Sequence, residues 1–167
     1  MLPFKRILCP TDFSTTSYDA LNAAAELALF FQAELTVMHV VPPAPVIASA
    51  MNGSDMTIAP ANLPDQTRRE AEMTLAEVAH DRVPHEVDLH LMVVEGEPAR
   101  AILEAAEQRA VDAVVIATQG RTGWRRFLFG SVAERVVRCA ACSVLTIHGE
   151  RARVSPGEPK ADKAVEV

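Results

Sequence analysis

The amino-acid sequence predicts an α/β protein with a single, mainly parallel β-sheet that has helices on both faces. Between residues 6 and 148, short apolar runs bounded by turn residues alternate with stretches whose apolar residues recur at steps of three and four. One run, residues 112–117 (Asp-Ala-Val-Val-Ile-Ala), is continuously apolar after its first residue, as expected of a central strand covered on both faces. Regular alternation of strands and helices implies parallel strands joined by helical crossovers.

The first half of the chain supplies two strands and two helices before a third strand. Residues 6–10 form a short apolar strand that ends in a Pro-Thr-Asp turn, and Ser14 is placed to cap the helix that follows. A second strand, residues 35–41, is stopped by two prolines. The predicted inner faces of the two helices consist of Tyr18, Leu21, Ala25, Ala28 and Leu29, and of Ala71, Leu75, Val78 and Ala79. Residues 86–94 are the predicted third strand.

The second half of the chain continues the alternation. Pro98 opens a third helix, where its missing N–H is not needed, and residues 112–117 follow as the fourth strand. After a loop at 118–130, Ser131 and Glu134 have capping-box spacing and start a fourth helix. Residues 142–148 form the fifth strand.

Two segments do not fit this pattern. The irregular segment 42–63 is rich in Pro, Ala, Ser and Met, and loops of this length are usually functional or disordered. The charged segment 149–167 has no periodicity and is predicted to be a disordered tail. We therefore expect one domain at 1–148, followed by the tail.

Composition and charge exclude several classes of protein. Hydrophobic residues make up 49% of the 167-residue chain, enough to build a core without disulfides or metals. The formal net charge of −6 argues against non-specific nucleic-acid binding, which depends on cations contacting phosphates. The chain has no apolar run of membrane-spanning length and no signal peptide or lipidation motif, so we expect a cytoplasmic protein without membrane contacts.

The cysteine usage is not that of a disulfide framework, because the chain has only three cysteines: Cys9, Cys139 and Cys142. The last two have the CxxC spacing of a redox or zinc pair. No second pair completes a zinc site, and the two cysteines span a helix-to-strand junction rather than opening a helix. Buried structural thiols are the favoured interpretation.

The loop after the fourth strand has the composition of a phosphate site. Glycines at 120, 123 and 130 allow positive φ and close approach to a ligand, and Gly130-Ser131 directly precedes a helix whose first N–H groups are unpaired. Tight turns explain the glycines equally well. Arg121 can face phosphate or lie in a solvated loop. The chain has no GxxxxGK[ST] or GxGxxG, so common P-loop and dinucleotide sites are excluded.

Polar residues also follow the first strand. Asp12 can accept hydrogen bonds from ribose hydroxyls or hold Mg²⁺ through water, although helix capping is the favoured role of an isolated Asp here. His39, at the end of the second strand, is expected to be a core or turn histidine rather than a catalyst.

Several segments together resemble the universal stress protein family. They are residues 7–14 (Ile-Leu-Cys-Pro-Thr-Asp-Phe-Ser), His39-Val40, and Gly120-Arg-Thr-Gly followed by Gly130-Ser-Val-Ala-Glu-Arg135. The segment Cys142-Ser-Val-Leu-Thr146 is similar to the last strand of the family. The resemblance implies a Rossmann-like fold of the adenine nucleotide alpha hydrolase type, with strand order 3-2-1-4-5, and usually a homodimer joined through the last strand, here residues 143–148.

For one branch of the family, the resemblance also implies ATP bound through G-x2-G-x9-G-[ST]. Here Ala117 replaces the first glycine, which costs roughly 1–2 kcal/mol if its φ is positive and nothing if φ is negative. By the same resemblance, the residues that surround adenosine are Pro10, Thr11, Asp12 and, through its backbone, Val40. Those that hold the phosphates are Gly120, Gly130, Ser131 and Val132.

The favoured function is therefore a stress-response protein that binds ATP, with Mg²⁺ as a candidate companion ion, and acts as a regulatory homodimer on an unknown protein partner. A slow ATP hydrolase or phosphotransferase is the second hypothesis. It lacks a P-loop lysine and an obvious base beyond Asp12. The third is an interaction module with a vestigial pocket that binds no nucleotide.

Overall fold

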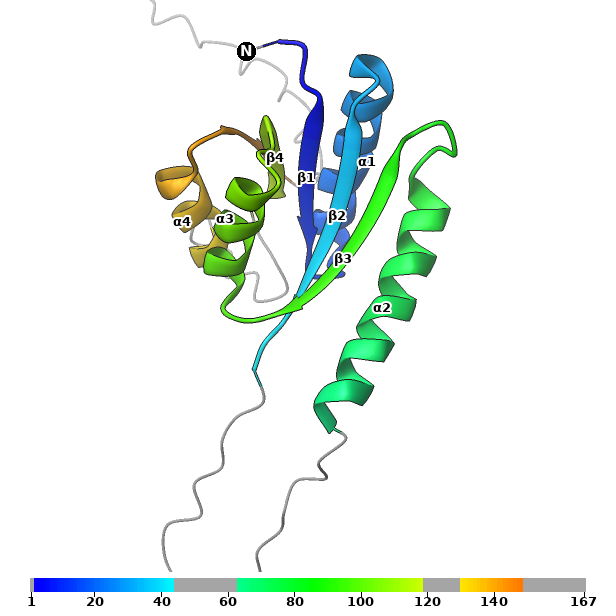
Figure 1. The fold of residues 1–167 in the computed structure, drawn as a ribbon, viewed down its shortest axis with the longest axis vertical. Helices are drawn as coiled ribbons and strands as arrows, with labels where there is room; N and C mark the ends of the chain where they lie inside the picture. The colour runs from blue at the N-terminus through cyan, green and yellow to red at the C-terminus, as the bar shows by residue number, and fades with distance from the viewer. Residues whose placement is uncertain (1, 44–62, 119–129, 149–167) are drawn as a thin grey trace, which may run out of the picture.

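The computed structural model describes residues 2–43, 63–118 and 130–148, which form a parallel sheet between two layers of helices (Figure 1). Most of the predicted irregular segment 42–63 and all of the predicted tail lie outside the described residues. In the described part of the chain, the elements are β1 (Arg6–Thr11), α1 (Thr15–Phe31), β2 (Glu34–Val41), α2 (Leu63–Arg82), β3 (Leu89–Glu95), α3 (Pro98–Gln108), β4 (Ala113–Ala117), α4 (Ser131–Cys139) and β5 (Ser143–Ile147).

The five strands lie in the order β3-β2-β1-β4-β5, and all the pairings are parallel. The fold class and strand order expected from the sequence are therefore confirmed. The central strand β1 pairs with β2 on one side and with β4 on the other, so Ile7 lies opposite both Leu35 and Ala113. The strands β3 and β5 form the two edges of the sheet.

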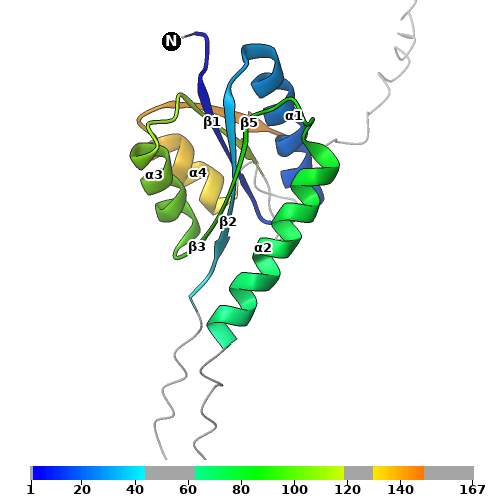
Figure 2. The same cartoon turned by 45° about the vertical axis from the view of Figure 1, so that its right-hand side comes forward.

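Alternate side chains of β1 enter two separate cores, one on each face of the sheet. Ile7 and Cys9 pack under α1 and α2 with Leu21, Leu35 and Leu75. Leu8, on the opposite face, packs under α3 and α4 with a cluster that includes Met38, Ile102, Val114 and Val136. Figures 1 and 2 show the corresponding layers, with α1 and α2 on one side of the sheet and α3 and α4 on the other. Burial on both faces explains why the central strands are continuously apolar.

Local capping signals decide where the helices begin. Ser14 is the N-cap of α1, as predicted, and its side chain accepts a hydrogen bond from the Ser17 N–H. Pro98 is the first residue of α3, also as predicted. The N-cap of α3 is Glu97, whose carboxylate accepts hydrogen bonds from the N–H groups of Ala99 and Arg100. Sequence patterning missed this cap because Glu is not among the residues preferred there.

Two predicted boundaries need correction. The third strand begins at Leu89 rather than at residue 86, because a turn closed by the Val87 N–H and the Pro84 carbonyl occupies the preceding residues. The fourth helix does begin at Ser131, but its N-cap is Gly130 and none of the side chains that the structure describes caps it, so the predicted capping box is wrong. Ser131 lies one residue too far along the chain to cap the helix.

None of the described helices combines the length and the apolar composition that crossing a membrane requires.

Asp112 fastens the start of β4 to the start of β1, because its Oδ2 accepts hydrogen bonds from the backbone N–H groups of Lys5 (2.8 Å) and Arg6 (2.9 Å). These bonds favour the ionised carboxylate and lower the pKa of Asp112 below 3.8. A carboxyl whose pKa is lowered by folding stabilises the fold above its unfolded pKa, and the contribution disappears as the pH falls through the folded pKa.

We therefore expect Asp112→Asn to lower the melting temperature at pH 7 and to have progressively less effect below about pH 4. The check is a series of thermal melts of both proteins from pH 7 to pH 2.5. Solvent screening at this half-buried position keeps the effect small. A melting-temperature difference that stays constant down to pH 2.5 would contradict the role of the charge.

Candidate functional site

The carboxyl ends of β1, β2 and β4 meet at one edge of the sheet, where parallel α/β proteins bind their ligands. Most of the residues predicted from the sequence lie at this edge or at the start of the helix that follows it. Pro10 and Thr11 end β1, Val40 is near the end of β2, and Ala117 ends β4. Gly130, Ser131 and Val132 form the N-cap and first turn of α4. Gly120 and Arg121 lie outside the described residues.

A network of hydroxyl and carboxylate groups fixes the turn after β1. The buried Thr11 hydroxyl is 2.9 Å from the Ser17 hydroxyl and accepts a hydrogen bond from the Phe13 N–H. Asp12 Oδ1 accepts hydrogen bonds from both the N–H and the hydroxyl of Ser14, at 3.1 and 2.6 Å. Asp12 is thus not itself the helix cap, which was its favoured role, but it orients the serine that is.

Phe13 adopts an uncommon backbone conformation at this edge. Its φ of 62° lies in the left-handed region, which is unfavourable for a residue with a bulky side chain. The ring stacks on His39 with centroids 4.2 Å apart, and His39 Nδ1 lies 2.8 Å from the Thr11 carbonyl oxygen. His39 is therefore a satisfied structural histidine, as predicted. Sequence analysis missed the role of Phe13, because strain of this kind depends on tertiary contacts.

Val40 lies just beyond the end of the β1–β2 ladder, whose last pair is Thr11 and His39. Its side chain is buried in the core under α3 and α4, so only its backbone is positioned to meet a ligand at the end of β1. The backbone role that the family resemblance implies for Val40 stays a prediction.

The two described motif positions that flank the loop have ordinary backbones. Ala117 is a strand residue, paired with Ile147, and is not among the described non-glycine residues with positive φ. The conformational penalty considered for Ala117 therefore does not arise. Gly130 has φ −72°, and a Cβ there would meet the Thr118 carbonyl oxygen at 3.4 Å, an ordinary contact. Gly130 therefore does not use the positive φ that a glycine allows.

The N-terminus of α4 differs from those of α1 and α3, which are capped by Ser14 and Glu97, because no side chain among the described residues caps it. Its first-turn N–H groups carry partial positive charge and suit an anion. Arg135 also links α4 to the cap of α3, because its guanidinium contacts Glu97 at 3.1 Å.

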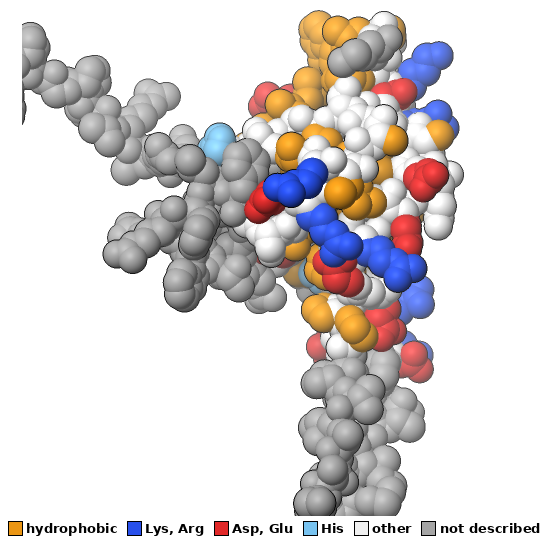
Figure 3. Space-filling view, turned by 90° about the vertical axis from the view of Figure 1, so that its left-hand side faces the viewer, with side chains coloured by type: hydrophobic (Ala, Val, Ile, Leu, Met, Phe, Trp, Pro, Cys, Tyr) orange, Lys and Arg blue, Asp and Glu red, His pale blue; other side chains and the backbone are white. Residues whose placement is uncertain are grey.

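The face formed by α3 and α4 carries basic and acidic side chains next to one another (Figure 3). Three ion pairs account for this arrangement: Arg100–Glu104, Arg135–Glu97 and Arg138–Glu134. The arginines of this face are thus balanced by nearby carboxylates.

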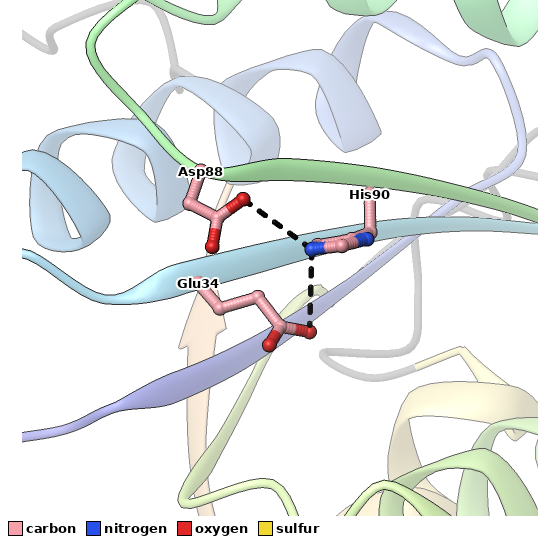
Figure 4. A group of neighbouring side chains, drawn as sticks. All are labelled: Glu34, Asp88 and His90. Carbon is pink, nitrogen blue, oxygen red and sulfur yellow. Dashed lines mark ion pairs between the residues drawn. The ribbon is translucent and has the colours of Figure 1, made fainter.

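A second group of polar side chains lies at the start of β2 and β3, remote in topology from the carboxyl ends of the strands. His90 Nε2 is 3.4 Å from Asp88 Oδ1 and 3.9 Å from Glu34 Oε1 (Figure 4). The Arg109 guanidinium is also 3.5 Å from Glu34 Oε1, so this carboxylate is already paired with a positively charged side chain. The group is best described as an ion-pair cluster. The sequence analysis did not single out His90, because its partner Glu34 lies in β2, far from His90 in the sequence.

The cysteine pair spans the junction between α4 and β5, as predicted, but its expected burial is wrong. Cys139 is exposed and Cys142 is half-buried, whereas Cys9 is fully buried in the central strand. Burial raises the pKa of Cys9 to about 12 and also raises that of Cys142.

These differences predict an order of reactivity toward a thiol reagent such as a disulfide chromophore at pH 8. Cys139 should react first and Cys142 more slowly. Cys9, which is fully buried and whose pKa is raised by burial, should react only after unfolding. Counting thiols against time, with and without guanidinium, checks the order, and Cys139→Ser should remove the fastest phase. Rapid labelling of Cys9 in the folded protein would show that the core opens more readily than its packing implies.

Comparison with known proteins agrees with this geometry. Residues 3–148 match the model of the universal stress protein family. The universal stress protein MJ0531 of Methanocaldococcus jannaschii is 35% identical over 144 residues, which cover 86% of this chain and 82% of that protein. Among solved structures, UspA of Lactobacillus plantarum superimposes with a TM-score of 0.63 at 25% identity, covering 88% and 99% of the two chains.

A third relative was solved with a ligand. It is a universal stress protein of Archaeoglobus fulgidus in complex with dAMP, with 25% identity and a TM-score of 0.56, and the match covers 88% of this chain and 99% of that one. A family match over most of the chain, a curated relative above 30% identity and the shared fold all point the same way. The chain therefore belongs to the universal stress protein family.

Proposed function

We propose that this protein binds an adenine nucleotide, ATP in particular, at the loops after β1, β2 and β4, and acts in the cytoplasmic stress response as a regulatory homodimer. The observation that carries the proposal is the N-terminus of α4. This helix starts with Gly130 and Ser131, and it has no side-chain cap within the described residues. Its first-turn N–H groups are thus available to a phosphate.

The dAMP complex of the Archaeoglobus fulgidus relative supports this choice of ligand class, because a universal stress protein with a similar fold holds an adenine nucleoside phosphate. On this chain we assign the adenosine to Pro10, Thr11, Asp12 and the backbone of Val40. We assign the phosphates to Gly130, Ser131 and Val132, with Ala117, Gly120 and Arg121 contributing from the rest of the motif.

Binding without efficient turnover is favoured over catalysis. Asp12 is the one candidate general base that the sequence analysis identified. Its Oδ1 accepts two hydrogen bonds from Ser14, one from the N–H and one from the hydroxyl. That carboxylate oxygen is therefore held as part of the turn rather than poised to activate water. For the same reason, Mg²⁺ enters the proposal as an ion carried by the triphosphate, with no protein ligand assigned.

Native mass spectrometry of freshly purified protein, followed by extraction and identification of any nucleotide, tests the proposal. We expect about one adenine nucleotide per chain, or a thermal shift on adding ATP with Mg²⁺. Ligand at 100 times its Kd adds about 2.7 kcal/mol to the unfolding free energy. An empty protein that ignores ATP would favour the interaction-only alternative, and rapid release of phosphate would favour the enzyme.

The dimer is proposed to form through β5, an edge strand with the half-exposed Leu145 at its centre. The other edge strand, β3, offers a matched control, because its Leu91 has nearly the same exposure, 43% against 42%. We expect Leu145→Glu to yield a monomer by light scattering at micromolar concentration and Leu91→Glu to leave the dimer intact. A charged side chain on the edge strand that forms the interface opposes its pairing with the second chain, whereas one on the other edge does not. The reverse result would place the interface on β3.

A further inference from the structure

Thr118, directly after β4, joins three segments of the chain through its polar groups. Its side chain is buried, with 1% of the residue exposed. Its N–H donates to the Ile147 carbonyl at 2.9 Å, and its own carbonyl accepts from the Gly130 N–H at 2.6 Å. Its hydroxyl lies 3.0 Å from Nδ1 of His148. The sequence analysis did not single out either Thr118 or His148.

These partners belong to two different parts of the molecule. Gly130 is the N-cap of α4, where the phosphates are proposed to bind. Ile147 and His148 end and follow β5, the edge strand proposed to form the dimer. Thr118 thus hydrogen-bonds to both Gly130 and Ile147. A displacement of the Gly130 backbone therefore alters one hydrogen bond of Thr118, and Thr118 also holds the end of β5. Protein interiors are close-packed, so such a displacement moves the neighbouring residues as well.

The hydroxyl is the part of this arrangement that depends on the side chain. Any residue except proline can make the two backbone hydrogen bonds at position 118, whereas the contact with His148 comes from the threonine hydroxyl. A buried polar group that loses its partner destabilises the arrangement that contains it. The hydroxyl bond thus favours one arrangement of the β5 end relative to the start of α4.

We propose that Thr118 is a positioning residue that couples nucleotide binding at the start of α4 to the end of β5 through His148. This inference rests on the proposed nucleotide function and assigns its regulatory connection. Because coupling between two sites is reciprocal, a nucleotide that orders the end of β5 is itself bound more tightly when that end is ordered.

Thr118→Val tests the proposal, because valine keeps the shape and both backbone bonds but removes the hydroxyl. ATP affinity is measured by calorimetry, and amide exchange of β5 is measured with and without ATP. In the native protein, we expect ATP to slow exchange in Ser143–Ile147. In Thr118→Val, we expect affinity to fall by about tenfold, within the usual range of coupling between sites, and the slowing to vanish.

Two sets of controls make the test specific. Thr36 is an equally buried threonine in β2, with 1% exposed, and Thr36→Val removes a hydroxyl of the same size without touching α4 or β5. It should leave both readouts unchanged. On the partner side, His148→Asn keeps a polar atom near the position of Nδ1 and should preserve the coupling, whereas His148→Leu should reproduce the effect of Thr118→Val. Both changes at this exposed position avoid disturbing the core.

The outcomes separate this inference from the proposed function. If the native protein binds no ATP, the proposed function fails and the coupling fails with it. If the native protein binds ATP, and Thr118→Val and His148→Leu both keep full affinity and the slowed exchange in β5, the coupling is refuted and the nucleotide function stands. Should Thr118→Val fold poorly, the pair of His148 variants decides the question.

Discussion

Replacing Gly130 with Asp is expected to raise the melting temperature of the nucleotide-free protein slightly and to abolish its stabilisation by ATP. The backbone at Gly130, with φ −72° and ψ 154°, suits any residue, and the added Cβ makes only an ordinary contact. The new carboxylate accepts hydrogen bonds from the first turn of α4, which stabilises the helix by a few tenths of a kcal/mol relative to glycine. It also places a negative charge where phosphate is proposed to bind.

Two like charges about 4 Å apart near a protein surface repel by roughly 4 kcal/mol, so ATP affinity should fall by at least about 100-fold. Thermal melts with and without ATP measure both effects. Gly130→Asn is the matched control, because asparagine caps as well as aspartate and has nearly the same shape without the charge. It should give the same gain in stability and retain more of the affinity. If the Asp variant keeps the full shift with ATP, the phosphates do not lie at the start of α4.

Truncation of the central strand should have the largest effect on stability. Leu8 is completely buried in β1, and it packs in the core between the sheet and the α3–α4 layer. Leu8→Ala removes several buried carbon atoms and leaves a cavity that strands paired on both sides cannot collapse to fill. We expect a loss of about 3–4 kcal/mol in the free energy of unfolding.

Urea denaturation of the native protein and two variants checks this value. Leu29, on α1, was predicted to lie on the inner face of the helix, but it is 47% exposed. Leu29→Ala makes the same chemical change at this exposed position and should cost less than about 1 kcal/mol. Equal losses for the two variants would mean that the core under α3 and α4 is loosely packed.

The parts of the fold that could be predicted from the sequence are those set by local pattern. Apolar runs predicted the strands, and Ser14 and Pro98 predicted where two helices begin. The family resemblance predicted the strand order. The predicted ends of two elements were wrong because backbone hydrogen bonds, which the sequence pattern does not show, set those ends. The turn from Pro84 to Val87 shortened β3, and Gly130 rather than Ser131 became the cap of α4.

The position of the candidate site in the fold was predictable, because glycines and a Pro-Thr-Asp turn follow strands whose ends meet at one edge of a parallel sheet. Its supporting contacts were not. Phe13 on His39 and Thr118 with His148 join residues that are 26 and 30 positions apart. The exposure of Cys139 likewise depends on how α4 lies against the sheet, which a spacing of two cysteines does not specify.

The strand order also has a consequence for synthesis on the ribosome. The first three strands to emerge, β1, β2 and β3, are neighbours in the sheet, so they and their helices can assemble while the rest of the chain is still being made. The other edge of β1 stays unpaired until residues 113–117 have emerged. The proposed nucleotide residues divide across this seam, with Asp12 and Val40 on the early side and Gly130 on the late side. A bound nucleotide would therefore connect the strands that form early to β4 and α4, which form later.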